Sequence, residues 1–226
     1  MRILERFSIG IVAFATVASA LAPSGFAQLL YDNSDTTKFT GQYYGATTEF
    51  GDQIKLTSGA GGLITSFKFD YYLGFSGTGN ETLDLRLYAN SAGGAPGALL
   101  YDSGAFSIAA NRGYANISAS GLSINAPNTL TWTVLFGNVN SSEQYGLLFY
   151  STPTVGSSFD DYWEKDASGN WVTKRFSTSG GPIANFGATV TGITAVPEPG
   201  TLGLGLFGGL GLLGLLARRK QVAEVR

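Results

Sequence analysis

Apolar and polar residues alternate through much of the middle of the chain. In residues 63–75, LITSFKFDYYLGF, most odd positions are apolar, while Ser66, Lys68 and Asp70 stand between them. Because successive side chains of a β-strand point to opposite faces, this period of two predicts a half-buried strand. The same pattern recurs at 82–89, 129–136, 145–151 and 186–193.

Segments rich in Gly, Asn, Ser and Pro separate these runs. They lie at 76–80, 91–97, 125–128, 137–142 and 166–170. Gly and Asn tolerate positive φ, and Pro-Gly suits a type II turn, so the segments predict turns between strands. No apolar stripe between the chain ends has a helical period. We therefore predict an all-β domain of about eight strands or more, folded as an antiparallel two-sheet β-sandwich of jelly-roll-like form.

The first 27 residues have the three parts of a secretory signal peptide. Arg2 and Arg6 come first, an apolar run follows, and Gly25-Phe26-Ala27 precedes the expected cleavage point. An uncleaved anchor helix is the alternative, although the apolar run is short for a membrane span. We predict that residues 1–27 are a signal peptide and that residues 28–195 form the exported domain.

A rigid element, an apolar run and a basic cluster follow one another near the C-terminal end. The rigid element is Pro197, Glu198, Pro199 and Gly200, and the basic cluster is Arg218, Arg219 and Lys220. The two prolines discourage helix and keep their segment extended. Residues 201–217 between these elements are uncharged, and as a helix they would rise about 25 Å, enough to cross a thin bilayer. The basic cluster would then stay on the cytoplasmic side.

This order of motif, apolar helix and basic tail resembles the PEP-CTERM sorting signal of Gram-negative bacteria. The resemblance covers residues 196–221. It implies that an exosortase, a membrane cysteine transpeptidase, recognises and processes the tail. It also implies an inner-membrane anchor through the C-terminal helix until processing, and then the outer surface or the exopolysaccharide matrix as destination. Residues 85–106 resemble a strand–turn–strand unit of exported bacterial β-sandwich domains, with Gly94-Ala95-Pro96-Gly97 before Leu99-Leu100.

Composition narrows the chemistry of the exported domain. The chain contains neither Cys nor His, which excludes disulfides, Cys/His metal sites and Ser-His-Asp or Cys-His catalysis. Residues 28–195 hold eight Lys or Arg and thirteen Asp or Glu, a net charge of 8 − 13 = −5. This acidic balance argues against nucleic acid as a partner.

An acidic cluster lies in residues 159–171, FDDYWEKDASGNW. Its carboxylates are Asp160, Asp161, Glu164 and Asp166. Calcium takes six to eight oxygen ligands from acidic loops, so a structural Ca²⁺ is one interpretation of the cluster. A solvated loop with a hairpin turn is the other. Two of these carboxylates facing a cleft would also suit a glycosidase.

Aromatic residues near predicted strand ends form a second candidate site. They are Tyr43, Tyr44, Tyr72, Trp163 and Trp171. Flat rings stack on the faces of sugars, so these residues are candidates for glycan binding. Rings that pack beneath the loops of a sandwich are the alternative. Adjacent residues of a strand face opposite ways, so at most one tyrosine of each adjacent pair belongs to the core.

We therefore predict a non-enzymatic, exported protein of the cell surface or exopolysaccharide matrix, with a structural, adhesive or glycan-binding domain. Its expected partners are the exosortase, the membrane before processing, and exopolysaccharide. No cofactor is expected apart from the structural Ca²⁺ considered above. The alternative function is a secreted carboxylate-based or Ca²⁺-dependent hydrolase that acts on glycans.

Overall fold

The computed structural model describes residues 26–57, 61–176, 183 and 185–194. In these residues the chain forms two antiparallel β-sheets and one 3₁₀ turn, η1 (Thr36–Lys38). The all-β, two-sheet prediction is confirmed, while the finer jelly-roll-like form stays a prediction. The signal peptide up to residue 25, the sorting motif and the C-terminal helix lie outside the described residues. Among the residues described, no helix has the length and apolarity needed to cross a bilayer.

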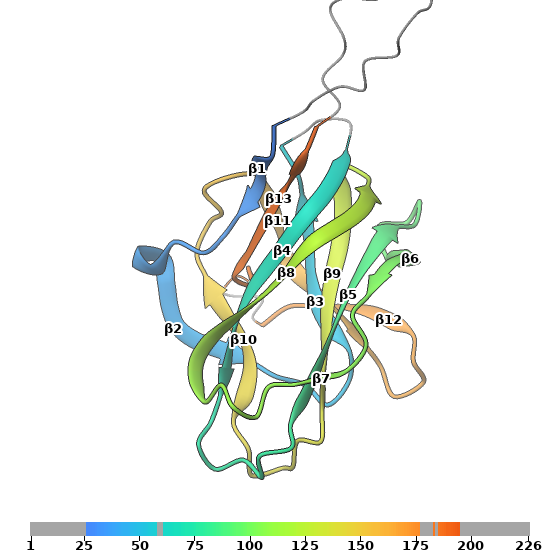
Figure 1. Ribbon diagram of the computed structural model, residues 1–226. Helices are drawn as coiled ribbons and strands as arrows, with labels where there is room; N and C mark the ends of the chain where they lie inside the picture. Colours follow the sequence, from blue (N-terminus) through green and yellow to red (C-terminus); the bar gives the residue numbers. More distant parts are fainter. Residues whose placement is uncertain (1–25, 58–60, 177–182, 184, 195–226) are drawn as a thin grey trace, which may run out of the picture.

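Sheet A has the strand order β1-β13-β4-β10-β2, and β8 pairs along the other edge of β4. Its strands are β1 (Gln28–Asp32), β2 (Phe39–Tyr44), β4 (Gly62–Leu73), β8 (Gly113–Ala126), β10 (Tyr145–Tyr150) and β13 (Ala188–Ile193). β4 is the central strand of this sheet. β13 and β10 pair with successive parts of one of its edges, and β8 pairs with the other edge. Figure 1 shows β8 running beside β4 along most of its length.

Sheet B has the order β12-β11-β3-β9-β5-β6, with the short β7 also paired to β5. Its strands are β3 (Phe50–Lys55), β5 (Thr82–Asn90), β6 (Pro96–Asp102), β7 (Phe106–Ser107), β9 (Thr129–Gly137), β11 (Ser157–Lys165) and β12 (Trp171–Lys174). The central strands β9 and β5 are the ones that the alternation at 129–136 and 82–89 predicted.

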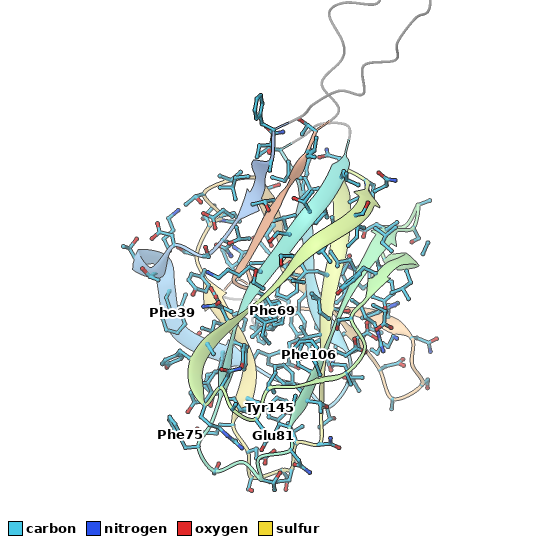
Figure 2. All side chains as sticks on the ribbon, in the orientation of Figure 1. Phe39, Phe69, Phe75, Glu81, Phe106 and Tyr145 are labelled. Carbon is cyan, nitrogen blue, oxygen red and sulfur yellow. The ribbon has the colours of Figure 1, made fainter. Side chains whose placement is uncertain are left out.

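Aromatic rings from both sheets fill the space between them. Trp132 of β9 lies 5.3 Å from Phe67 and 5.8 Å from Phe69 of β4, measured between ring centroids. Figure 2 shows Phe69 in this interior. Every buried core residue in the described part lies between Leu30 and Val190. Because the described residues already bury an extensive apolar layer, we expect residues 28–195 to fold as a domain by themselves.

One carboxylic acid lies inside this apolar layer. Asp52 faces Trp132 across the β3–β9 pair and is fully buried. Its Oδ2 accepts hydrogen bonds from Ser158 Oγ at 2.6 Å and from the backbone N–H of Phe186 at 3.3 Å. Its Oδ1 has no hydrogen-bond partner among the described residues. Burial raises the pKa of Asp52 well above its usual range, because the apolar surroundings disfavour the charged form.

The raised pKa predicts a pH-dependent penalty at this position. A carboxyl group whose folded pKa is raised contributes stability below its ordinary pKa of about 3.9, and that stability is lost as pH rises through the folded value. The Asp52→Asn variant stays neutral. The free energy of unfolding of the variant, relative to the parent, should therefore rise from mildly acidic to mildly alkaline buffer, as measured by urea unfolding.

The exposed Asp160 provides the control. Its negative charge raises the pKa of Asp52 less than burial does, so Asp160→Asn should change stability in the same direction as Asp52→Asn but by less than about 0.5 kcal/mol at any of these pH values. A difference between Asp52→Asn and the parent that is flat or falls with pH would contradict the account of Asp52.

Candidate functional site

A row of aromatic side chains lies on the outer face of sheet A. Its members, called the aromatic row below, are Tyr43, Tyr72, Tyr114, Phe39 and Tyr150. They come from four strands: β2 supplies Tyr43 and Phe39, β4 Tyr72, β8 Tyr114 and β10 Tyr150. Pairing in the sheet brings them together, since Tyr72 is opposite Tyr114 and Phe39 is opposite Tyr150.

The rings of the aromatic row contact one another in sequence. Ring centroids are 4.6 Å apart for Tyr43 and Tyr72, and 5.2 Å apart for Tyr72 and Tyr114. Phe39 continues the row, 5.4 Å from Tyr114 and 5.5 Å from Tyr150. Tyr114 is 62% exposed and presents its ring to solvent. Figure 2 shows Phe39 at the outside of the molecule beside β2.

Close packing beneath the rings holds the aromatic row in place. The hydroxyl of Tyr150 donates a hydrogen bond of 2.9 Å to Asp70, which faces outward from β4. A Cβ atom on Gly187 would lie 2.4 Å from the Tyr150 ring, so the missing side chain of this glycine makes room for that ring. Leu148 also faces outward, opposite Tyr43, yet only 4% of it is exposed. Beneath its rings the row is thus packed like a small second core.

Two glycines allow β2, the strand that carries Tyr43, to pair closely with β10. β2 and β10 approach so closely that a Cβ on Gly146 would lie 2.1 Å from the carbonyl oxygen of Tyr44. A Cβ on Gly45 would lie 2.2 Å from the carbonyl oxygen of Tyr145. Neither distance is sterically allowed, and both obstacles are backbone atoms. The β2–β10 pairing therefore requires glycine at both positions.

A hollow of about 410 Å³ opens at the Tyr43 end of the row. Its polar lining includes Asn140, Ser141 and Gln144 from the loop between β9 and β10, and Thr47. Glu143 also lines the hollow, but its carboxylate already accepts hydrogen bonds from the backbone N–H groups of Thr78 and Asn140. The hollow therefore offers mainly neutral hydrogen-bonding groups next to an aromatic ring.

Of the predicted aromatic residues, Tyr44 has a different place from Tyr43. It faces inward, where its ring lies 5.2 Å from Phe50 and 5.1 Å from Tyr162. Its hydroxyl donates a hydrogen bond of 2.6 Å to Glu164, which also pairs with Lys174 at 2.6 Å. This contact raises the pKa of Tyr44, with burial as the larger cause. The sugar-binding hypothesis does not extend to this inward ring.

Trp171 covers a buried ionic network on the outer face of sheet B. Its ring lies 4.9 Å from Lys165 Nζ and 5.6 Å from the ring of Tyr88. Both of these side chains bind Glu49, which is 3% exposed and also accepts hydrogen bonds from Arg86 and Thr133. Burial alone would raise the pKa of Glu49, but the hydrogen bonds led by Lys165 hold it below its usual range. Trp171 thus shields a structural ion pair from water.

A second hollow, of about 420 Å³, gathers three predicted residues on sheet B. Trp163, Asp160 and Asp161 line it together with Phe159 and Arg175. The indole N–H of Trp163 donates to Gln53 Oε1 at 3.1 Å, and Phe159 is 46% exposed. This hollow is the competing position for a sugar, and it differs from the aromatic row in its charged lining.

The four predicted calcium ligands do not come together. Asp161 pairs with Arg175, and Glu164 pairs with Lys174. Asp166 accepts hydrogen bonds from the backbone N–H groups of Ser168 and Asn170, which closes its own turn. Over the described residues, no group of three or more acidic side chains has the arrangement needed to hold a metal ion.

Three rings of the row, those of Tyr114, Phe39 and Tyr150, were missed by the sequence analysis. Tyr114 lies in β8, where Ala115, Ile117 and Ala119 alternate with polar residues. The small size of the alanines weakens the apolar signal, although the period of two is present. Phe39 follows directly on η1, and no local pattern points to its outward position.

Comparison with known proteins decides the identity of the chain's C-terminal end. A model of the PEP-CTERM protein-sorting motif matches residues 195–220. By this motif, the chain is a PEP-CTERM protein. The resemblance seen in residues 196–221 is thereby confirmed, and this PEP-CTERM protein is an exosortase-sorted extracellular protein. Neither the curated proteins nor the solved structures yield a match. The function of the folded domain therefore has to be argued from its surface.

The close approach of β2 to β10 gives a direct prediction for this PEP-CTERM protein. Gly146→Ala places a methyl group against the carbonyl of Tyr44 and should separate the strand that carries Tyr43 from the rest of the row. We expect a loss of about 1–3 kcal/mol in the free energy of unfolding, measured with urea. In the control, Gly93→Ala, the nearest heavy atom is 4.0 Å away, so stability should not change measurably. Equal stability of the two variants would refute the steric argument.

Proposed function

We propose that the domain binds extended polysaccharide chains at the bacterial surface or in the exopolysaccharide matrix, without catalysing a reaction on them. The aromatic row of sheet A is the contact surface. The observation that carries this proposal is the continuous ring-to-ring contact from Tyr43 through Tyr72 to the exposed Tyr114. Soluble domains leave such contiguous aromatic surface exposed mainly where it serves recognition.

Ring stacking supplies the affinity in this proposal. The C–H faces of a sugar ring are apolar, and a tyrosine ring buries them without losing much conformational freedom. A row of rings along one face suits a chain of sugars better than a single sugar, because successive units meet successive rings. The packed floor of Tyr150, Asp70 and Leu148 holds the rings in place before the ligand arrives, which reduces the entropic cost of binding.

Hydrogen-bonding groups beside Tyr114 and beside Tyr43 supply the specificity. Asn116 and Ser118 are exposed on β8 beyond Tyr114, on the same outer face of the sheet. Asn140 and Gln144 lie in the hollow beyond Tyr43. These side chains are neutral and both donate and accept hydrogen bonds. The surface is therefore matched to the hydroxyl groups of a polysaccharide. On the same face, Lys68 lies opposite Ser118 and Asp70 lies opposite Asn116.

No metal is required for this mode of binding, because the rings and amides contact the sugar directly. The proposed localisation agrees with it, since exosortase sorting delivers the protein outside the cell. Binding should accordingly be the same in buffer with Ca²⁺ and in buffer with a chelator.

Affinity electrophoresis of residues 28–195 tests the proposal. The protein runs through gels that contain the soluble polysaccharide secreted by the source bacterium, and through gels with uncharged reference polysaccharides. Tyr72→Ala and Tyr114→Ala should each weaken binding by about ten-fold, the equivalent of one stacked ring. The parent should be retarded at polysaccharide concentrations where the double variant migrates freely.

Phe159→Ala and Trp163→Ala are the matched controls, because they remove rings from the hollow on sheet B. They should leave the retardation unchanged. Absence of retardation in every gel would overturn the glycan-binding function. A loss confined to Phe159→Ala and Trp163→Ala would overturn the assignment to the aromatic row.

A further inference from the structure

We propose that the free edge of β8 pairs with β8 of a second copy of this chain, antiparallel, so that two A sheets join into one. This inference goes beyond sugar binding and does not depend on it. It begins from the position of β8. Among the described residues, β4 is the one strand that pairs with β8, so the opposite edge of β8 keeps unpaired backbone groups. β6 of sheet B comes near β8 but does not pair with it.

The edge of β8 is long and regular. The strand covers fourteen residues, Gly113–Ala126. Its register against β4 is unbroken from Gly113 to Ser120, and the shift beyond Ser120 coincides with the positive φ of Gly121. Along these eight residues, the N–H and C=O groups of alternate residues point away from β4 in one unbroken register, which is the template that another strand needs.

No charged residue or proline protects this edge. From Gly113 to Ala126 the sequence contains neither. The other outer strands of the two sheets each carry a feature that discourages pairing. β12 has Lys174 within its four residues, β6 begins with Pro96 and has two register shifts, β1 has a register shift within five residues, and β2 has positive φ at Gly41. β8 also follows Arg112 and has a register shift beyond Ser120, but the residues 114–120 between these features are uncharged and keep one register, which distinguishes this edge from the others.

Charge explains why a second copy fits this edge. The exported domain carries a net charge of −5, so two copies repel each other over most of their surfaces. At β8 two identical strands meet without any like-charge pair. Pairing centred on Ile117 would place Asn116 of one copy opposite Ser118 of the other, a combination that forms hydrogen bonds across strands. A strand without charges is in this sense complementary to itself.

Joining the A sheets would also join their outer faces. Tyr114 stands near the start of β8 and belongs to the aromatic row. In antiparallel pairing centred on Ile117, the two Tyr114 residues would be six positions apart along the strand direction, about 20 Å. Two rows of rings would then lie on one continuous face. For any ligand that spans both rows, the second contact becomes intramolecular and the complex dissociates more slowly.

Sedimentation velocity of residues 28–195 over a range of concentrations, without any sugar, tests the proposal. The parent should form a reversible dimer. The double variant Asn116→Lys with Ser118→Lys places like charges opposite each other and should weaken the dimer by about ten-fold or more. Thr191→Lys is the control, because it adds a lysine to the same outer face on β13, which lies between β1 and β4 and has no free edge. It should leave the dimer unchanged.

Two results would overturn the proposal: a parent that stays monomeric throughout, or equal weakening by the β8 and β13 variants. A second readout covers the case in which the lysine variants fold poorly. The chain has no cysteine, so introduced cysteines report contacts without background. A mixture of Asn116→Cys and Ser118→Cys copies should form disulfide-linked dimers of one copy of each, because these two positions face each other in the proposed pairing. A mixture of Asn116→Cys and Thr191→Cys copies should not, and equal yields from the two mixtures would contradict strand pairing.

Discussion

The two-residue period of the strands in sheet A determines both the core and the outer surface of this protein. On β4, Phe69 and Tyr71 turn inward to the rings of the other sheet, and Asp70 and Tyr72 turn outward to the aromatic row. A slip of one residue would exchange the two sets. The aromatic row thus depends on the core of the protein. It exists because the core fixes the register, and the register fixes which rings face solvent.

Glycine positions and buried polar groups make this register unique. Gly45 and Gly146 permit the approach of β2 to β10, which sends Tyr43 outward and Tyr44 inward. On sheet B, Glu49 binds four side chains that come from strands β5, β9 and β11, so that sheet is held in register by hydrogen bonds rather than by apolar packing alone. The two sheets therefore reach specificity by different means, steric exclusion in one and a closed ionic network in the other.

The sequence allowed part of this to be predicted. Strong alternation located β4, β5 and β9, and the sorting motif was recognisable because it is a contiguous pattern that needs no fold. Tyr114 was missed because the alanines of β8 are too small to give a clear apolar signal. Asp52 points into the core, where the alternation of a strand predicts an apolar residue, and no local sequence pattern predicts this. The neighbours of Trp163 and Trp171 come from distant parts of the chain, so only the folded structure separates a ring in a hollow from a ring over an ion pair.

The central claim is that the outer rings of sheet A contact sugar while the inner rings do not. The most direct test is a nuclear magnetic resonance titration of residues 28–195, with ¹³C in the tyrosine rings, by oligosaccharides released from the bacterium's own polysaccharide. The account predicts saturable shifts of the ring signals of Tyr43, Tyr72 and Tyr114, with those of Tyr44 and Tyr162 unchanged. Bound oligosaccharide that leaves the signals of Tyr43, Tyr72 and Tyr114 in place would contradict it.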